Sequence, residues 1–263
     1  MQPVGRLLRE WRHRRRLSQL DLALEAEISQ RHLSFVESGR STPSREMLLR
    51  LAERLDIPLR ERNVLLTAAG FAPTYRERPL DDPDLVAARE AVDVVIRGHE
   101  PYPALAVDRH WHLVSANAAV MRLLVGVPER MLQPPVNVLR LSLHPDGLAP
   151  RILNFREWRE HVVVRLSRQI DVSGDGALLA LLEELKGYPV PDRFHPPQRR
   201  GDVGGAVVPF QLTLEGAQLS FFTTTTVFGT PVDVTLSELA IESFFPADAE
   251  TADAMRHMAG QSR

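Results

Sequence analysis

With 263 residues, the chain is long enough for two domains that each bury a core, and its lack of cysteine excludes disulfides, thiolate nucleophiles and cysteine-ligated metal centres. No stretch approaches the roughly 20 apolar residues of a membrane span, and the N-terminus lacks the apolar core of a secretory signal, so we expect a cytoplasmic protein without membrane contact. The net charge of −2 is distributed unevenly along the chain. Residues 1–78 contain 15 Arg and 10 acidic residues, and this basic part is where a polyanion is expected to bind.

Apolar periodicity and capping residues predict a series of short helices from Val4 onward. Ser18 and Asp21 form a capping-box pattern at the start of the second helix, and Ser29 is a suitable cap for the third. Gly39 is expected to end the third helix in the left-handed conformation that glycine favours. Two short helices joined by a tight turn are therefore predicted in this segment.

Two further helices complete the N-terminal part. The pair Thr42–Pro43 is expected to open the fourth helix, and Pro58 to open a fifth that stops at Gly70. Residues 73–84 are rich in proline and charge and have no apolar period, which predicts a linker. We therefore expect an all-α domain of five helices over residues 1–72.

The pattern changes after a predicted helix from Asp84 to about Gly98. Strand-like runs flank a polar turn in ALAVDRHWHLVSAN and again in VVPFQLTLEGAQLSFFTTTTVFG, which predicts two β-hairpins. The segment VDVTL is expected to continue the sheet or to return to it. Further helices are predicted at Asn117–Leu124, after Asn154, at Ala177–Lys186 and after Asp248. Residues 85–263 are thus predicted to form an α+β domain with a small antiparallel sheet.

The second and third helices, with E-x-G closing the third, match a helix-turn-helix of the kind found in phage-type repressors. Leu33 and Val36 would face inward, so the polar side chains of the third helix would face a DNA major groove. The turn position that often carries glycine is Glu27, which implies a backbone outside the left-handed region or some strain. The residues predicted to contact DNA are Gln19, Ser29, Gln30, Arg31, His32, Ser34, Phe35 and Arg40. The cluster Arg12, Arg14, Arg15 and Arg16 is expected to add attraction that does not depend on DNA sequence.

The stretch LSQLDLALEAEISQRHLSFVESGRSTPSREMLLRLAERLDIP resembles the XRE family of helix-turn-helix regulators. This resemblance implies a role in reading bases for Gln30, Arg31 and Phe35, and a role in contacting the DNA backbone for Gln19 and Arg40. The partner that it implies is double-stranded DNA.

Three stretches of the second domain, EPYPALAVDRHWHLVSAN, NVLRLSLHPDGLAPRILN and TTTTVFGTPVDVTLSELAIESFFPAD, resemble the ligand-binding domain of MmyB-like transcription regulators. The resemblance implies a PAS-like fold and a regulator that responds to a small molecule, with fatty-acid-like molecules among the suggested ligands. No cofactor is required by this interpretation.

No local pattern supports catalysis or a bound metal. The serines lie outside any G-x-S-x-G elbow, and a Gly-rich phosphate loop is missing from the sequence. His110 and His112 would face the same side of a strand, but without a third ligand at close spacing we predict that they bind no metal. We therefore expect no catalytic residues and no enzyme activity.

A ligand pocket is predicted instead, lined by apolar side chains of the sheet and its covering helices, although the same side chains could simply fill a core. Arg140 is expected to pair with an acidic residue such as Asp233 or with a ligand carboxylate. The residues predicted to contact the ligand are Trp111, Asn117, Asn137, Arg140 and Phe222.

The predicted function is therefore that of a sequence-specific DNA-binding transcription regulator that senses a small apolar ligand. Because one module makes few base contacts, we expect a homodimer, held together by the helix near Leu85–Ile96 or by the last helix. Two alternatives remain open. The second domain could bind a protein partner, as in an antitoxin-like regulator, or could act as an enzyme on the small molecule.

Overall fold

A computed structural model of the chain describes residues 2–191, 207–229 and 233–260. The chain divides into two compact units. The first comprises Met1–Pro79, Asp171–Gly174 and Thr230–Ser237, and the second comprises Leu80–Ile170, Asp175–Gly229 and Glu238–Arg263. Each unit has its own hydrophobic core.

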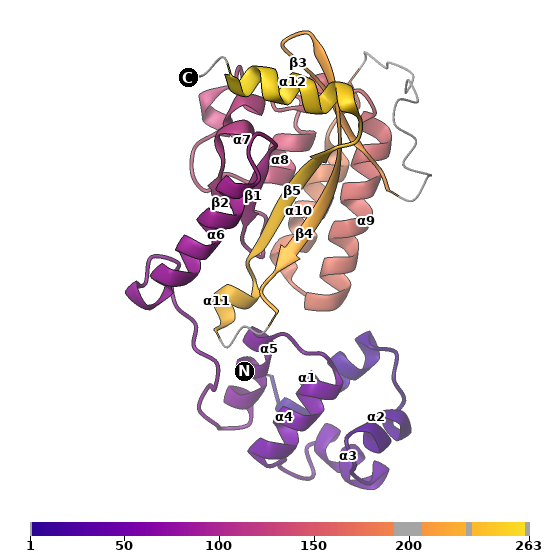
Figure 1. The fold of residues 1–263 in the computed structure, drawn as a ribbon. Coiled ribbons are helices and arrows are strands. Elements are labelled where there is room, and N and C mark those ends of the chain that lie inside the picture. The colour runs from indigo at the N-terminus through magenta and orange to yellow at the C-terminus, as the bar shows by residue number, and fades with distance from the viewer. Residues whose placement is uncertain (1, 192–206, 230–232, 261–263) are drawn as a thin grey trace. The chain divides into compact units, whose positions relative to one another are not determined.

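The helices of the N-terminal part of the first unit are α1 (Val4–Arg14), α2 (Gln19–Glu25), α3 (Gln30–Glu37), α4 (Arg45–Arg54) and α5 (Leu59–Ala68) (Figure 1). They enclose a core that includes Leu8, Leu22, Leu33, Leu51 and Leu66. The predicted all-α helix-turn-helix region is therefore confirmed.

The predicted capping of α2 and α3 is confirmed in detail. The Ser18 side chain accepts from the Asp21 N–H at 3.1 Å, and the Asp21 carboxylate accepts from the Ser18 N–H at 3.1 Å. Ser29 accepts from the His32 N–H at 3.1 Å. Glu27 in the turn has φ 56°, so it adopts the left-handed conformation, which is costly for a residue with a Cβ atom.

The predicted start of α4 is wrong by two residues. The cap is Ser44, whose side chain accepts from the Met47 N–H at 3.2 Å, and not the Thr42–Pro43 pair. A serine hydroxyl can satisfy an N–H of the first turn, whereas proline presets only the backbone angle.

The described part of the segment VDVTL, residues 233–236, does not belong to the sheet, so that prediction is wrong there, and Val232 lies outside the described residues. The described part begins the short helix α11 (Val234–Ser237), whose first turn is capped by Asp233 through the Thr235 N–H at 2.9 Å. The Val234 N–H donates to the carbonyl of Arg76 at 2.8 Å, so this segment belongs to the first unit. The local hydrogen bonds of Asp233 outweigh the strand preference of the valines.

The second unit is built on a fully antiparallel sheet with the order β2-β1-β5-β4-β3. Its strands are β1 (Ala104–Val107), β2 (Leu113–Ala116), β3 (Phe210–Leu214), β4 (Ala217–Val227) and β5 (Ala240–Pro246). Both predicted hairpins and the α+β class are confirmed. The central strand β5 was not predicted. Its partner β1 lies far from it in the sequence, and α11 separates it from its other partner β4, so neither pairing forms a hairpin.

Helices and short 3-10 turns surround this sheet (Figure 1). They are η1 (Pro83–Leu85), α6 (Val86–Gly98), α7 (Ala118–Leu123), η2 (Glu129–Met131), α8 (Val138–Leu143), η3 (Ala149–Arg151), α9 (Phe155–Ser173), α10 (Gly176–Gly187) and α12 (Ala249–Gly260). The predicted helices are confirmed, and α8 is an addition. Of the helices formed by the described residues, none is long and apolar enough to cross a membrane.

Asn154 lies directly before α9 as predicted, but its side chain does not cap that helix through a helical N–H. Its Oδ1 accepts from the Gln211 N–H of β3 at 3.2 Å, and its Nδ2 donates to the carbonyl of Pro209 at 2.7 Å. Asn154 therefore fastens the start of α9 to β3.

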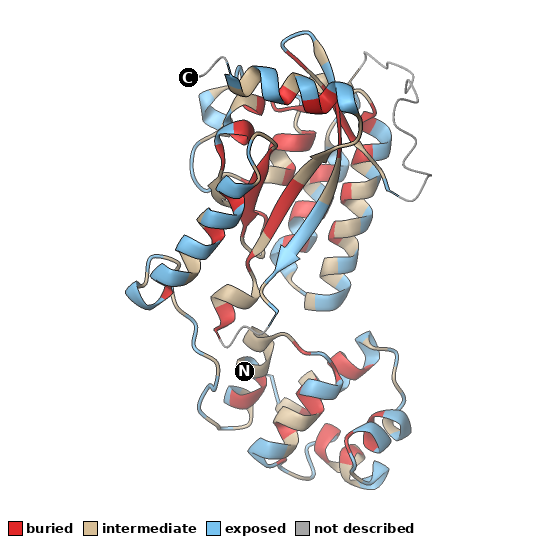
Figure 2. Ribbon diagram, in the orientation of Figure 1, coloured by how far each residue is buried: buried red, intermediate tan, exposed pale blue. Residues whose placement is uncertain are grey.

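The two faces of the sheet have different surroundings. Leu105, Glu242 and Phe244 face a cavity that α9 also lines. On β4, the Ser220 N–H donates to the Thr251 hydroxyl of α12 at 2.9 Å, which ties that helix to the sheet. Figure 2 shows buried residues running along the centre of the sheet between its covering helices.

Candidate functional site

The first candidate site is the outer face of α3. Leu33 and Val36 are buried in the core, as the sequence predicts. Of the residues predicted to contact DNA, Ser29, Gln30, Arg31 and Arg40 are exposed, while Gln19, His32, Ser34 and Phe35 are half-buried. Helix α3 thus presents a polar face of the kind that enters a major groove.

Phe35 lies between two arginines. The guanidinium carbon of Arg31 is 5.4 Å from the centre of the Phe35 ring, and that of Arg40 is 5.9 Å from it. Cations at this distance are attracted to the face of an aromatic ring. Phe35 therefore holds two positive charges beside the exposed face of α3.

Glu37 at the end of α3 forms a buried ion pair with α1. Arg12 donates through Nε at 2.7 Å and through Nη2 at 2.9 Å to its carboxylate. The side chain of Arg12 is only 9% exposed and is paired with Glu37, so the predicted attraction of DNA by Arg12 is wrong. The pair joins α1 to the end of α3.

Gln19 was predicted to contact a phosphate, but its Nε2 donates to the Glu37 carboxylate at 2.8 Å. Burial by itself raises the pKa of Glu37, but the hydrogen bonds from Arg12 and Gln19 and the charge of Arg12 outweigh it, so this pKa lies below its usual value. Gln19, Arg12 and Glu37 together therefore fix α2, α1 and α3 against one another.

His32 contributes less to the exposed face than predicted. Among the described residues, its Nε2 is buried and has no hydrogen-bond partner. This nitrogen is therefore turned away from the surface that Gln30 and Arg31 present.

The second candidate site is a cavity of about 90 Å³ inside the second unit. Its wall is mostly apolar and includes Leu105, Leu123, Leu139, Leu141, Val162 and Phe210. This volume is below the roughly 300–1,000 Å³ of most ligand pockets, so a ligand of the usual size would have to widen the cavity.

Five polar side chains also line this cavity, namely Ser142, His161, Arg165, Thr223 and Glu242. Arg165 of α9 and Glu242 of β5 form a two-pronged ion pair, with Nη1 at 2.9 Å from Oε2 and Nη2 at 2.5 Å from Oε1. Sequence analysis missed both residues, because 77 positions separate them and neither belongs to a local motif. A basic residue on a long amphipathic helix was the only available signal.

Trp111 is the predicted ligand residue that lines the cavity. Its indole Nε1 donates to Gln169 at 2.8 Å, and the guanidinium of Arg165 lies 4.6 Å from its ring centre. Its φ of 66° is unusual for a bulky side chain and is held by these contacts. The turn before β2 therefore places an aromatic ring beside Arg165, which with Glu242 and His161 forms what we call the polar end of the cavity.

Two predicted ligand residues, Asn117 and Asn137, are helix caps outside the cavity wall. The side chain of Asn117 accepts from the Val120 N–H at 3.2 Å and so caps α7. The side chain of Asn137 accepts from the Arg140 N–H at 3.1 Å and so caps α8. The side-chain amides of both residues thus form hydrogen bonds with backbone N–H and carbonyl groups.

Arg140 and Phe222 also lie outside the lining residues of the cavity. Arg140 does have an acidic partner, but it is Glu184, at 2.7 Å from both Nε and Nη2, and not Asp233. Phe222 stacks on Phe245 with ring centres 5.2 Å apart. Of the five predicted ligand residues, the structure thus brings only Trp111 to the cavity.

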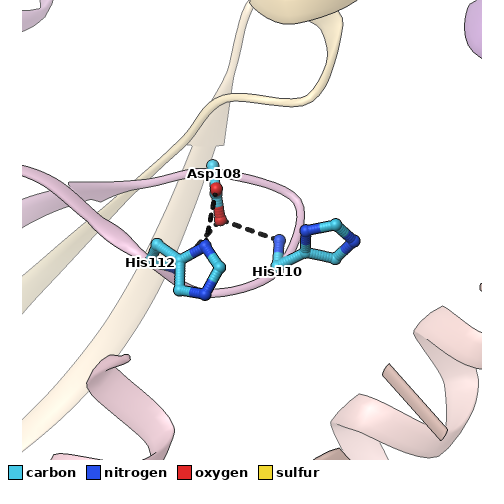
Figure 3. A group of neighbouring side chains, drawn as sticks. All are labelled: Asp108, His110 and His112. Carbon is cyan, nitrogen blue, oxygen red and sulfur yellow. Dashed lines mark hydrogen bonds and ion pairs between the residues drawn. The ribbon is translucent and has the colours of Figure 1, made fainter. Parts of the chain in front are cut away.

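A third group of side chains offers ligand atoms of the kind that bind metal ions. One atom each from Asp108, His110 and His112 lie within 4.8 Å of one another (Figure 3). The prediction that His110 and His112 bind no metal rested on the lack of a third metal-binding residue nearby, and Asp108 is such a residue.

Each member of this group has other bonds. One oxygen of Asp108 accepts from the N–H groups of His110 and His112 at 2.8 Å each, and the other lies 3.0 Å from the His112 ring. The His110 ring bonds to Asp175 at 2.9 Å. These contacts stabilise the β1–β2 turn, and the absence of a metal here stays a prediction.

Comparisons with known proteins agree with this division of the chain. Residues 8–62 match the helix-turn-helix family, and residues 88–258 match the MmyB-like transcription regulator ligand binding domain. No curated protein matches the chain. A solved structure described as an RNA-binding Light-Oxygen-Voltage Receptor aligns with 96% of this chain and 62% of its own, at 13% identity and a TM-score of 0.29, which is too low to support an argument. Since the second match covers well over half of the chain, the protein belongs to the MmyB-like transcription regulators and carries a helix-turn-helix before its ligand-binding domain.

Proposed function

We propose that the protein is a cytoplasmic transcription regulator that binds a specific DNA sequence and changes its affinity for that sequence when a small, mainly apolar molecule occupies the second unit. The observation that carries this proposal is the pairing of an exposed polar α3 with an apolar cavity in the same chain. The cytoplasmic location is part of the proposal, because a protein that binds chromosomal DNA must be in the same compartment as that DNA.

The DNA contacts that we propose divide into two kinds. Gln30 and Arg31 are exposed at the start of α3, where side chains reach base edges, and Phe35 is placed to contact a thymine methyl group. We propose that Arg40 and Ser29, which are both exposed, contact the DNA backbone.

For the second unit we propose a sensor of a small apolar molecule, of the general kind to which fatty-acid-like compounds belong. The strand order β2-β1-β5-β4-β3 supports a PAS-like fold for this sensor. The apolar wall supplies the affinity, and Trp111 supplies an aromatic surface beside the polar end. No cofactor and no catalytic step form part of the proposal.

We propose that the regulator acts as a homodimer through α6. On this helix, the side chains of Val94 and Val95 are 71% and 47% exposed, whereas those of Val92 and Ile96 are buried. Exposed apolar side chains that lie next to each other are typical of a protein interface. By contrast, α12 turns its apolar Ala252 and Met255 inward.

The proposal is tested by selecting DNA from a random pool with the full-length protein and measuring binding by fluorescence anisotropy. We expect one enriched site with two-fold symmetry, bound by a dimer in sedimentation. We also expect the affinity to change when an apolar extract of the source cells is added, because only a ligand that prefers one state can shift the equilibrium. Enrichment of no sequence would refute the regulator, whereas a co-purifying protein at the second unit would favour the antitoxin-like alternative.

A further inference from the structure

The polar end of the cavity contains both members of an ion pair. Arg165 and Glu242 are both lining residues, and the Glu242 side chain is only 6% exposed. Arg165 also donates to the Thr225 hydroxyl at 2.7 Å. The positive and negative charges therefore balance each other, and neither is left over for a ligand.

His161 is the third polar group at this end and lies one helical turn before Arg165 on α9. Its ring stacks on Trp158, with ring centres 5.4 Å apart and planes 24° from parallel. Across the described residues, no hydrogen bond reaches the His161 ring nitrogens, so they remain available to a molecule in the cavity.

The charge of His161 follows from its surroundings. Burial lowers its pKa below the usual value, and the charge of Arg165 lowers it further. The charge of Glu242 opposes this in part, and that of Arg168 adds a smaller lowering. The ring is therefore neutral near neutral pH. A neutral imidazole offers one donor and one acceptor, which suits a hydroxyl or carbonyl group.

From this geometry we infer that the cavity selects an uncharged ligand, an apolar chain or ring with one alcohol, ketone or ester oxygen that bonds to His161, and that it discriminates against a carboxylate. The inference rests on the proposed sensing function and defines its ligand class.

The reason for the discrimination is electrostatic. A carboxylate at the polar end would lie beside Glu242, whose partner Arg165 is the cation among the described lining residues and is already paired. Arg168 is exposed and is not among the lining residues. In an apolar surrounding two like charges repel strongly. A fatty acid would have to bind in its protonated form or displace Glu242 from Arg165. An alcohol of the same chain length has the same apolar surface and avoids this cost.

The test compares 1-octanol with octanoate on the full-length protein, using isothermal titration calorimetry at about pH 7. The two probes share one apolar chain, so chain burial cancels in the comparison. We expect 1-octanol to bind about tenfold more tightly or better, because octanoate makes an unfavourable like-charge contact and tenfold in affinity corresponds to only about 1.4 kcal/mol.

Two variants locate the cause of the preference. Glu242→Gln keeps the shape of the side chain but leaves the charge of Arg165 uncompensated, so we expect octanoate to become the tighter ligand. Glu184→Gln is the matched control, because it also removes the carboxylate partner of a two-pronged arginine pair, but outside the cavity wall. This control is expected to keep the preference for 1-octanol.

His161→Phe tests the hydrogen bond and keeps the stacked ring. We expect it to weaken 1-octanol several-fold and to leave octanoate unchanged.

If the wild-type protein binds octanoate as tightly as 1-octanol or more tightly, the inferred selection of an uncharged ligand is wrong while small-molecule sensing stands. If Glu242→Gln does not fold, this wild-type comparison still decides. If neither probe binds up to its solubility limit, and no other alcohol or acid of shorter chain binds, both the ligand class and the proposed sensing function are refuted.

Discussion

Arg12 and Glu37 form a buried two-pronged ion pair between α1 and the end of α3, with N–O distances of 2.7 and 2.9 Å. Both side chains are almost fully excluded from solvent, at 9% and 3% exposure. Removing one partner leaves a buried charge without compensation. We therefore expect Arg12→Ala to lower the free energy of unfolding of the helix-turn-helix unit by about 3–5 kcal/mol.

Urea denaturation of the variant checks this value. The double variant Arg12→Met/Glu37→Leu is the control, and we expect it to recover most of the loss because two apolar side chains need no partner. A double variant as unstable as the single one would show that the pair itself, and not the stranded charge, stabilises the unit.

The same pair makes the stability of the first unit depend on pH. The pKa of Glu37 is lower in the folded than in the unfolded chain, so its contribution is complete above its unfolded value of about 4.3 and is lost as the pH falls through the folded value. Amide hydrogen exchange, corrected for its intrinsic pH dependence, should show protection of α3 decreasing over this acidic range. Glu37→Gln is expected to remove that decrease, and an unchanged pH profile in this variant would contradict the assignment.

Substitutions on α3 are expected to separate base contacts from backbone contacts. Gln30→Ala should change the preference for one base pair by about 1–3 kcal/mol, because we propose that its exposed amide reads a base edge. Arg40→Ala should weaken binding to all sequences alike and reduce the slope of log K against log salt by about one. Binding curves for a set of single-base variants of the selected site would check both. Equal effects of the two substitutions on every sequence would mean that α3 is not the recognition helix.

The Arg140–Glu184 pair has the same two-pronged geometry as the buried pair but a different environment. Its side chains are 41% and 37% exposed, so water screens their attraction. We expect Glu184→Gln to cost under about 1 kcal/mol in urea denaturation. A loss as large as that of Arg12→Ala would show that Arg140 has a structural role beyond this pair.

Divalent metal is expected to have no effect on the second unit. Asp108 accepts two backbone N–H groups and contacts His112, and His110 bonds to Asp175, so these side chains already stabilise the turn. Zinc in molar excess, or its removal with a chelator, should leave the thermal midpoint unchanged. A shift that disappears in His112→Ala but persists in His144→Ala would instead establish a metal site at this turn.

Local signals in the sequence were sufficient for the helices and hairpins whose bonds lie close in the chain. The capping box of Ser18 and Asp21 and the turn at Glu215 and Gly216 are confirmed because every group involved lies within a few residues. Helix α8 did have a local signal, the cap residue Asn137, which was assigned to ligand contact instead. The two pairings of strand β5 lacked such signals. The position of this strand depends on pairing with distant segments, which a local pattern does not record.

The sequence by itself determined the class of this protein, the helix-turn-helix, the face of α3 that carries Gln30 and Arg31, and the α+β character of the second domain. Only the tertiary structure decided which polar residues meet. It placed Arg12 inside the core, used Asn117 and Asn137 as caps, and joined Arg165 to Glu242 at the cavity. The physical reason is that periodicity specifies which face of an element is buried, whereas the partner of a buried charge depends on which distant elements pack against that face.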